Sequence, residues 1–206
     1  MINVFFDMDG TLIDSANAIS AAVNEIRAEL NLSPLEREKI MQIINTPQID
    51  WAKELYEIKN FNHSSFKEGF EKYFIKHYQQ SVVLFDGIME LLDFLKKQNC
   101  YLAIATNAPQ SSLTRILEKH NILHYFDKIL GVSVGIEPKP SPMMLNLLKE
   151  EAPYQTSLFI GDSAKDKEAA QNAKLTYYHA KWYAKDLKEN EFSNAEELLN
   201  FLKNRL

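Results

Sequence analysis

The feature that most constrains the fold of this sequence is a short apolar stretch near its start that ends on two acidic residues. The stretch from Ile2 to Phe6 is rich in β-branched and aromatic side chains and does not alternate with polar ones. This pattern is typical of a strand covered on both faces in the middle of a parallel sheet. The stretch ends at Asp7-Met8-Asp9-Gly10. Burying these carboxylates would cost on the order of several kcal/mol unless a cation or hydrogen-bond donors meet them. We therefore expect a cationic group there.

Asp7 and Asp9 are two positions apart, so in an extended segment their side chains point to the same side. Both carboxylates can then reach one point beyond the carboxyl end of the strand, where open α/β sheets bind their ligands. Gly10 allows a tight turn directly after them. The alternative, a strand that simply ends in an Asx-turn, accounts for only one of the two acids.

The next part of the chain, to about residue 82, has the apolar spacing of helices and contains no strand candidate. Helix-start signals occur at Ser15, Ser33, Thr46 and Ser65. Four helices are predicted over residues 15–82. They would form a small helical bundle inserted after the first strand.

From Asp86-Gly87 onward the pattern alternates between strands and helices, which predicts a parallel sheet. Strands are expected at residues 101–105, 128–131, 157–160 and 176–179; helices are expected from residue 88, near residue 113, at 141–150, at 165–173 and from Ser193. The predicted fold class is α/β. A Rossmann-like, doubly wound parallel sheet core is expected from residues 1–14 and 83–206.

Composition limits the partners. The net charge is −5 and no Lys/Arg run is present, which argues against nucleic acid and anionic membranes. Met1 leads directly into the first strand without a basic leader, and no apolar run approaches the roughly 20 residues of a membrane span. We expect a cytoplasmic protein, either a monomer or a weak dimer. The single cysteine, Cys100, and the histidines are expected to be structural or exposed, since the histidines show no metal-ligand spacing. The histidines are His63, His77, His120, His124 and His179.

Polar residues follow three of the predicted strands at the same relative place. They are Asp7-Met8-Asp9, Thr106-Asn107 and Gly161-Asp162-Ser163. Because parallel strands end at one edge of a sheet, these side chains are expected to converge, with Lys139 in a loop that reaches the same edge. Taken singly, each has an ordinary explanation. Lys139 could be a solvated lysine, Thr106 a helix cap and Asp166 a first-turn acid.

Taken together, these motifs resemble the haloacid dehalogenase superfamily, in particular its phosphatases with a helical, C1-type cap, such as phosphoglycolate phosphatases. The resemblance covers nearly the whole chain. Its four motifs are Asp7-Met8-Asp9-Gly10-Thr11, Thr106-Asn107, Lys139-Pro140, and Gly161-Asp162-Ser163-Ala164-Lys165-Asp166.

The resemblance implies a role for each matching residue. Asp7 would be the nucleophile that forms an aspartyl phosphate, and Asp9 the general acid and base. Mg²⁺ would be held by Asp7, by Asp162 and by the main-chain carbonyl of Asp9, with Asp166 orienting metal-bound water or the lysine. Phosphate oxygens would be held by Lys139, by the Thr106 hydroxyl and by main-chain N–H groups at Met8, Asp9 and Asn107.

The chain departs from the family pattern in its predicted cap, where the loop at residues 43–50 lacks glycine. Asn45, Thr46, Gln48 and Trp51 are the candidates for substrate selection. The expected function is Mg²⁺-dependent hydrolysis of a small-metabolite phosphomonoester. The alternatives are a phosphomutase of the β-phosphoglucomutase type, a dehalogenase, and a non-catalytic binding module.

Overall fold

The computed structural model describes residues 1–58, 72–78 and 81–206. The chain divides into two compact units. One unit joins Met1–Ile13 to Leu84–Leu206, and the other is Asp14–Val83. The short strands β2 (Ile13–Asp14) and β3 (Val83–Leu84) stand where the sequence passes from one unit to the other. The assignment of the two units as a core and a cap domain stays a prediction.

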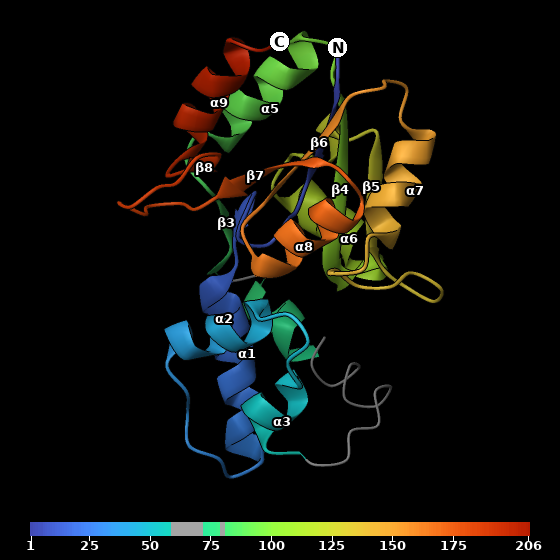
Figure 1. Cartoon of the computed structure of the whole chain (residues 1–206). Coiled ribbons are helices and arrows are strands. Elements are labelled where there is room, and N and C mark those ends of the chain that lie inside the picture. Colours follow the sequence, from blue (N-terminus) through green and yellow to red (C-terminus); the bar gives the residue numbers. More distant parts are fainter. Residues whose placement is uncertain (59–71, 79–80) are drawn as a thin grey trace. The chain divides into compact units, whose positions relative to one another are not determined.

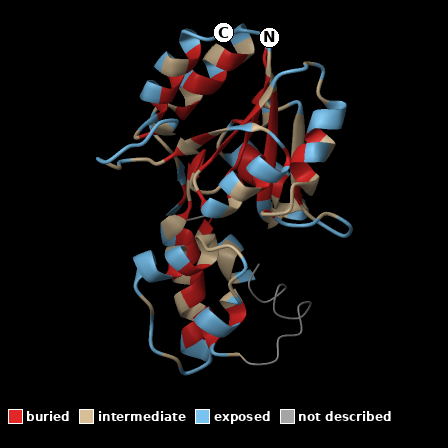
Figure 2. Cartoon of the chain, in the orientation of Figure 1, coloured by how far each residue is buried: buried red, intermediate tan, exposed pale blue. Residues whose placement is uncertain are grey.

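The first unit is built on a six-stranded sheet with the order β5-β4-β1-β6-β7-β8, in which neighbouring strands run parallel (Figure 1). These strands are β1 (Asn3–Phe6), β4 (Tyr101–Pro109), β5 (Lys128–Val132), β6 (Ser157–Gly161), β7 (Thr176–Ala180) and β8 (Glu191–Phe192). Strand β1 lies between β4 and β6, and all four of its residues are buried (Figure 2). The prediction of an α/β fold with a parallel sheet is confirmed.

Helices flank the sheet on two sides. The helices of this unit are α5 (Ile88–Lys97), α6 (Gln110–Lys119), η1 (Leu123–Tyr125), α7 (Met143–Glu151), α8 (Ala164–Asn172) and α9 (Ala195–Lys203). Apolar residues of α7 and α8 pack in one cluster with Phe5 and Phe159 of the sheet. Val4 and Phe6 point to the opposite face because side chains alternate along a strand. Helices α5 and α9 pack against each other on the other side of the sheet from α7 (Figure 1).

A buried polar residue, Asn3, fixes the register of β1 against β6. Its Nδ2 donates to the carbonyl of Tyr154 at 2.7 Å and to Oγ of Ser157 at 2.8 Å. Its Oδ1 accepts from the N–H of Tyr154 at 3.2 Å. At the other end of the strand, the N–H of Asp7 donates to the carbonyl of Ile160 at 2.8 Å. The end of β1 is therefore held level with the end of β6.

The second unit is helical in its described part. It contains α1 (Ala16–Glu29), α2 (Arg37–Asn45), α3 (Trp51–Tyr56) and a helical stretch at residues 72–78. Its buried cluster includes Ile19, Val23, Ile40, Ile43 and Leu55. The helix start predicted at Ser65 and the residue His63 lie outside the described residues.

Two predicted helix starts in this unit are wrong. The N–H and the carbonyl of Leu35 both bond to the side chain of Asn24, at 2.9 Å each, and the carbonyl of Ser33 accepts from Nε of Arg27 at 2.6 Å. These contacts keep the chain extended, so α2 begins at Arg37 and not at Ser33. A local capping signal was outweighed by tertiary hydrogen bonds.

The start predicted at Thr46 is displaced in the same direction. The Thr46 hydroxyl donates back to the carbonyl of Gln42 at 2.6 Å. Helix α3 is capped instead by Asp50, whose carboxylate accepts from the N–H of Lys53. The last helix, α9, begins at Ala195, and its cap is Asn194 and not Ser193 as predicted.

Within the described residues, no helix combines the length and the apolar character that a membrane crossing requires.

Candidate active site

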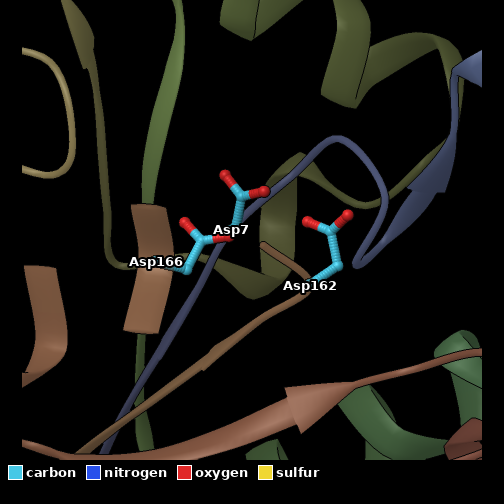
Figure 3. Close-up of side chains that lie close together, drawn as sticks. All are labelled: Asp7, Asp162 and Asp166. Carbon is cyan, nitrogen blue, oxygen red and sulfur yellow. The ribbon is translucent and has the colours of Figure 1, made fainter. Parts of the chain in front are cut away.

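Three aspartates gather at the carboxyl edge of the sheet. Asp7 follows β1, Asp162 follows β6, and Asp166 lies in the first turn of α8. One carboxylate oxygen from each lies within 4.8 Å of the others. Figure 3 shows the three carboxylates, carried by separate segments, gathered around one region. The structure thus brings together Asp7 and Asp162, which the strand pattern predicts at one edge, and adds Asp166 from the fourth motif.

Lys139 lies among these acids and is almost completely buried. Its Nζ lies 2.5 Å from Oδ1 of Asp7 and 2.5 Å from Oδ1 of Asp166. Its ammonium also lies 5.3 Å from the centre of the Phe159 ring. Burial opposes the positive charge, but the carboxylates of Asp166 and Asp7 outweigh that effect and raise the pKa of Lys139. The cation expected at the end of β1 is, in part, this lysine.

Asp166 is held on both of its oxygens. Oδ1 contacts Lys139, while Oδ2 accepts from the N–H of Ser163 at 3.0 Å and from its hydroxyl at 2.5 Å. The Ser163 hydroxyl oxygen in turn accepts from the N–H of Asp166, which completes a capping box at the start of α8. A Cβ on Gly161 would lie 2.6 Å from Cβ of Asp166, so a glycine is required for this approach.

Asp162 lies directly against the turn that follows β1. Gly10 in that turn has a φ of +85°, and a Cβ added to it would lie 2.5 Å from Cγ of Asp162. The turn closes because the Met8 carbonyl accepts from the N–H groups of Leu12 and Ile13. Gly10 therefore serves both the turn and the close approach of Asp162.

Burial changes the proton affinity of the acids. Burial is the main reason why the pKa of Asp7 is raised to about 7; Lys139 acts in the opposite direction, and the charges of Asp166 and Asp9 add to the increase. Burial also raises the pKa of Asp162, assisted by the charges of Asp166 and Asp7. The arrangement therefore favours uptake of positive charge, whether as protons or as a cation.

The second motif lies within β4, which runs past its expected end at residue 105 to Pro109. Thr106 is buried, and its Oγ1 accepts from the N–H of Ala108 at 3.2 Å. The Asn107 side chain donates to the carbonyl of Lys139 at 2.9 Å and accepts from its N–H at 2.7 Å. Asn107 therefore clamps the main chain of the lysine. The sequence did not indicate this pairing.

Asp9 is half-buried and lies one residue before Gly10. Its charge contributes to the raised pKa of Asp7, which places the two acids within electrostatic reach of each other.

The candidates for substrate selection lie in the second unit. Asn45 is the last residue of α2, and Thr46 is bonded to Gln42. Gln48 is exposed with a φ of +58°. Trp51 packs partly against the helical cluster, with its ring centre 6.4 Å from that of Tyr56. Their role in substrate selection stays a prediction.

Two residues of β7, Tyr177 and His179, also contact this region. His179 was expected to be structural or exposed, and Tyr177 was not among the predicted site residues. The Tyr177 hydroxyl donates to the carbonyl of Gly161 at 2.8 Å. Nε2 of His179 lies 2.8 Å from the carbonyl oxygen of Asp162. Their spacing on one strand, two positions apart next to a motif-bearing strand, is the only sequence signal that could have indicated them.

Comparison with known proteins identifies the family of this chain. Residues 4–180 match the family model described as haloacid dehalogenase-like hydrolase. A phosphoglycolate phosphatase from Mannheimia succiniciproducens is 30% identical over 182 residues, which cover 83% of this chain and 81% of that protein.

Two solved structures show the same fold. One is a Haemophilus somnus protein predicted to be a phosphoglycolate phosphatase, with a TM-score of 0.80, 26% identity and 97% coverage of both chains. The other is a Thermotoga maritima protein assigned as a β-phosphoglucomutase, with a TM-score of 0.74, 24% identity and 100% coverage of both chains.

Proposed function

This chain belongs to the haloacid dehalogenase-like hydrolase family, and we propose that it is a Mg²⁺-dependent phosphatase that hydrolyses a small phosphomonoester through an aspartyl phosphate on Asp7. The observation that carries the proposal is the ion pair between Asp7 and Lys139, whose Oδ1 and Nζ atoms are 2.5 Å apart, beside the carboxylates of Asp162 and Asp166. A nucleophilic carboxylate, a buried cation and further acids form a set suited to phosphoryl transfer.

The donor set fits a hard divalent cation, because such ions prefer carboxylate oxygens. Asp166 is engaged on both oxygens by Lys139 and Ser163, so Asp7 and Asp162 are the side chains that would hold the ion. The main-chain carbonyl of Asp9 is a further ligand in this proposal. When bound, Mg²⁺ would polarise the phosphoryl group and hold it beside Asp7.

The reaction divides into two steps. A carboxylate oxygen of Asp7 attacks phosphorus, the bond from phosphorus to the ester oxygen breaks, and Asp9 gives its proton to the leaving oxygen. Asp9 then takes a proton from the water that hydrolyses the aspartyl phosphate. Inorganic phosphate leaves, and Asp7 returns to its starting state.

Lys139 and Thr106 would bind the phosphoryl oxygens. Lys139 is held by two acids and by Asn107, so its ammonium is placed before substrate arrives. Preorganised charge of this kind stabilises a transition state without reorganisation at the moment of reaction. In this scheme the Asn107 side chain acts on the lysine, while its main-chain N–H would bind a phosphate oxygen.

The substrate is a small phosphate ester, and phosphoglycolate is the first to test because relatives of this chain are named phosphoglycolate phosphatases. Binding of nucleic acid is not expected. A cytoplasmic location and a monomeric or weakly dimeric state stay predictions.

A phosphomutase of the β-phosphoglucomutase type would use the same first step, and the Thermotoga maritima structure shares the fold. The second step separates the two. Free phosphate released from a panel of esters supports the hydrolase, whereas transfer to a second hydroxyl without phosphate release supports the mutase. Turnover that EDTA does not abolish would contradict the metal requirement. A purified protein with no turnover at all would indicate a binding module.

The roles of Asp7 and Asp9 are tested by acid-quenched intact mass with p-nitrophenyl phosphate. Asp7→Asn lacks the nucleophile and should show no phosphoryl adduct. Asp9→Asn should form the adduct and then stall, because this leaving group needs no acid but hydrolysis needs the base, whose loss costs about 10² to 10⁴-fold. An adduct on Asp7→Asn and none on Asp9→Asn would show that the roles are reversed.

A further inference from the structure

Strand β7 holds the loop that carries Asp162 through two side chains on one of its faces. Strand β7 runs parallel to β6, and His179 stands opposite Gly161 in the register. Tyr177 and His179 are two positions apart, so both side chains point to the same side of the sheet. Their ring centres are 5.7 Å apart. Both bond to main-chain carbonyls at the end of β6, Tyr177 to that of Gly161 and His179 to that of Asp162.

The Tyr177 hydroxyl fixes the peptide group that precedes Asp162. It donates to the carbonyl of Gly161 at 2.8 Å and lies 3.4 Å from the carbonyl oxygen of Ser163. Because a peptide group is planar, a bond to its carbonyl also orients the N–H of Asp162.

His179 fixes the peptide group that follows Asp162. A carbonyl oxygen only accepts, so Nε2 of His179 must carry the hydrogen in its 2.8 Å bond to Asp162. The N–H of the same peptide group belongs to Ser163 and donates to Oδ2 of Asp166 at 3.0 Å. This second peptide plane is therefore held at both of its ends.

With both flanking peptide planes fixed, the direction of the Cα–Cβ bond of Asp162 is fixed as well. The side chain is then left with rotation about two bonds, and packing against Gly10 restricts that rotation. The capping box of α8 anchors the loop on the far side of Asp162, and the two β7 bonds hold the peptide groups on either side of Asp162 itself.

We propose that Tyr177 and His179 are positioning residues that aim the Asp162 carboxylate toward Asp7 and so set the affinity of the site for a divalent cation. The proposal rests on the assignment of Asp162 as a metal ligand. Groups that orient ligands in this way typically change metal affinity by about 10 to 100-fold when they are removed.

The experiment measures Mn²⁺ binding to the EDTA-stripped full-length protein, without substrate, by electron paramagnetic resonance of the free ion. Tyr177→Phe removes one hydroxyl, and His179→Leu removes the Nε2 donor. Both should weaken Mn²⁺ binding by about tenfold or more. His179→Gln retains an N–H at a similar reach and should restore most of the affinity. Tyr178→Phe is the matched control, because Tyr178 packs against Phe192 and Phe201 on the other face of β7.

A purely structural role would lower the melting temperature of these variants and leave the Kd for Mn²⁺ of the folded protein unchanged. If the two residues position Asp162, the metal concentration at half-maximal activity should also rise, while kcat at saturating metal recovers. If His179→Leu does not fold, Tyr177→Phe decides the question, since it only deletes one oxygen atom. Wild-type affinity in folded Tyr177→Phe and His179→Leu overturns the proposal, as does an equal loss in His179→Gln and His179→Leu.

Asp162→Asn separates this inference from the proposed function. If Asp162→Asn loses Mn²⁺ affinity and the β7 variants keep it, the positioning role fails and the metal assignment stands. If Asp162→Asn binds Mn²⁺ as tightly as the wild type, the metal assignment itself fails.

Discussion

Replacing Gly10 by alanine should inactivate the enzyme through the added Cβ rather than through loss of stability. Gly10 has a φ of +85°, and a Cβ there would lie 2.5 Å from Cγ of Asp162 and closer still to one of its oxygens. Carbon atoms in contact are normally about 3.5 to 4.0 Å apart. The Asp162 carboxylate, or the turn that carries Gly10, must therefore move by about 1 Å.

The expected magnitude has two parts. A side chain with positive φ costs about 1 kcal/mol of folding free energy. A displacement of about 1 Å at a catalytic group can lower the rate by about 10²-fold. The second part follows only if the position of Asp162 matters for catalysis or for metal binding.

Gly135 offers a matched control, since its φ is +80° and a Cβ there would have nothing within 4 Å. Gly10→Ala and Gly135→Ala should lose similar free energy of unfolding, measured by urea titration in EDTA. Only Gly10→Ala should lose kcat/KM for the best substrate, by about 10²-fold. Equal kcat/KM in the two variants would refute the argument, because the contact with Asp162 would then have no consequence.

Three further predictions concern other parts of the chain. Asn107→Ala should lower kcat/KM because it releases the main chain of Lys139. In a protein that already carries Lys139→Ala, the same change should lower kcat/KM little further. Full additivity in this double-mutant cycle would contradict the clamp. Gln48→Ala and Trp51→Ala should change kcat/KM by different factors for different esters, whereas one uniform loss would indicate packing alone. Hydrogen bonds from Lys76 and His77 lower the pKa of Glu25, so this contact stabilises the fold above the unfolded-state pKa of 4.5 and is lost as pH falls through the lower folded-state value. The stability advantage over Glu25→Gln in urea titrations should therefore shrink as the pH falls below about 4.5; an advantage that grew over that range would reverse the sign.

The sequence was sufficient for the parts of the fold that repeat a simple pattern. The non-alternating strand from Ile2 to Phe6 indicated a buried central strand, and β1 indeed lies between β4 and β6. The polar residues after β1 and β6 could be placed at one edge because all parallel strands end on the same side.

The side-chain pairings at that edge could not be predicted. Asn107 bonds to main-chain atoms of Lys139, 32 positions away, and any residue at position 139 except proline would offer the same atoms. His179 bonds to a main-chain carbonyl in the same way. A hydrogen bond to main-chain atoms does not depend on the type of the partner residue, so the sequence does not indicate it. For the same reason, the contacts of Asn24 with Leu35 that delay α2 were invisible to a local helix-start rule.

The charges at the site support the proposal that a lysine and a metal ion act there together. When ionised, Asp7, Asp162 and Asp166 carry one negative charge each, and Lys139 offsets a single one of them. The remainder matches one divalent cation. Burial raises the pKa of Asp7 above its usual range, which favours the protonated carboxyl group over the carboxylate. A protonated carboxyl group is a poor nucleophile. A bound cation would therefore contribute to the reaction by keeping Asp7 ionised, in addition to any effect on the phosphoryl group, and Lys139 alone cannot supply this because its charge is shared with Asp166.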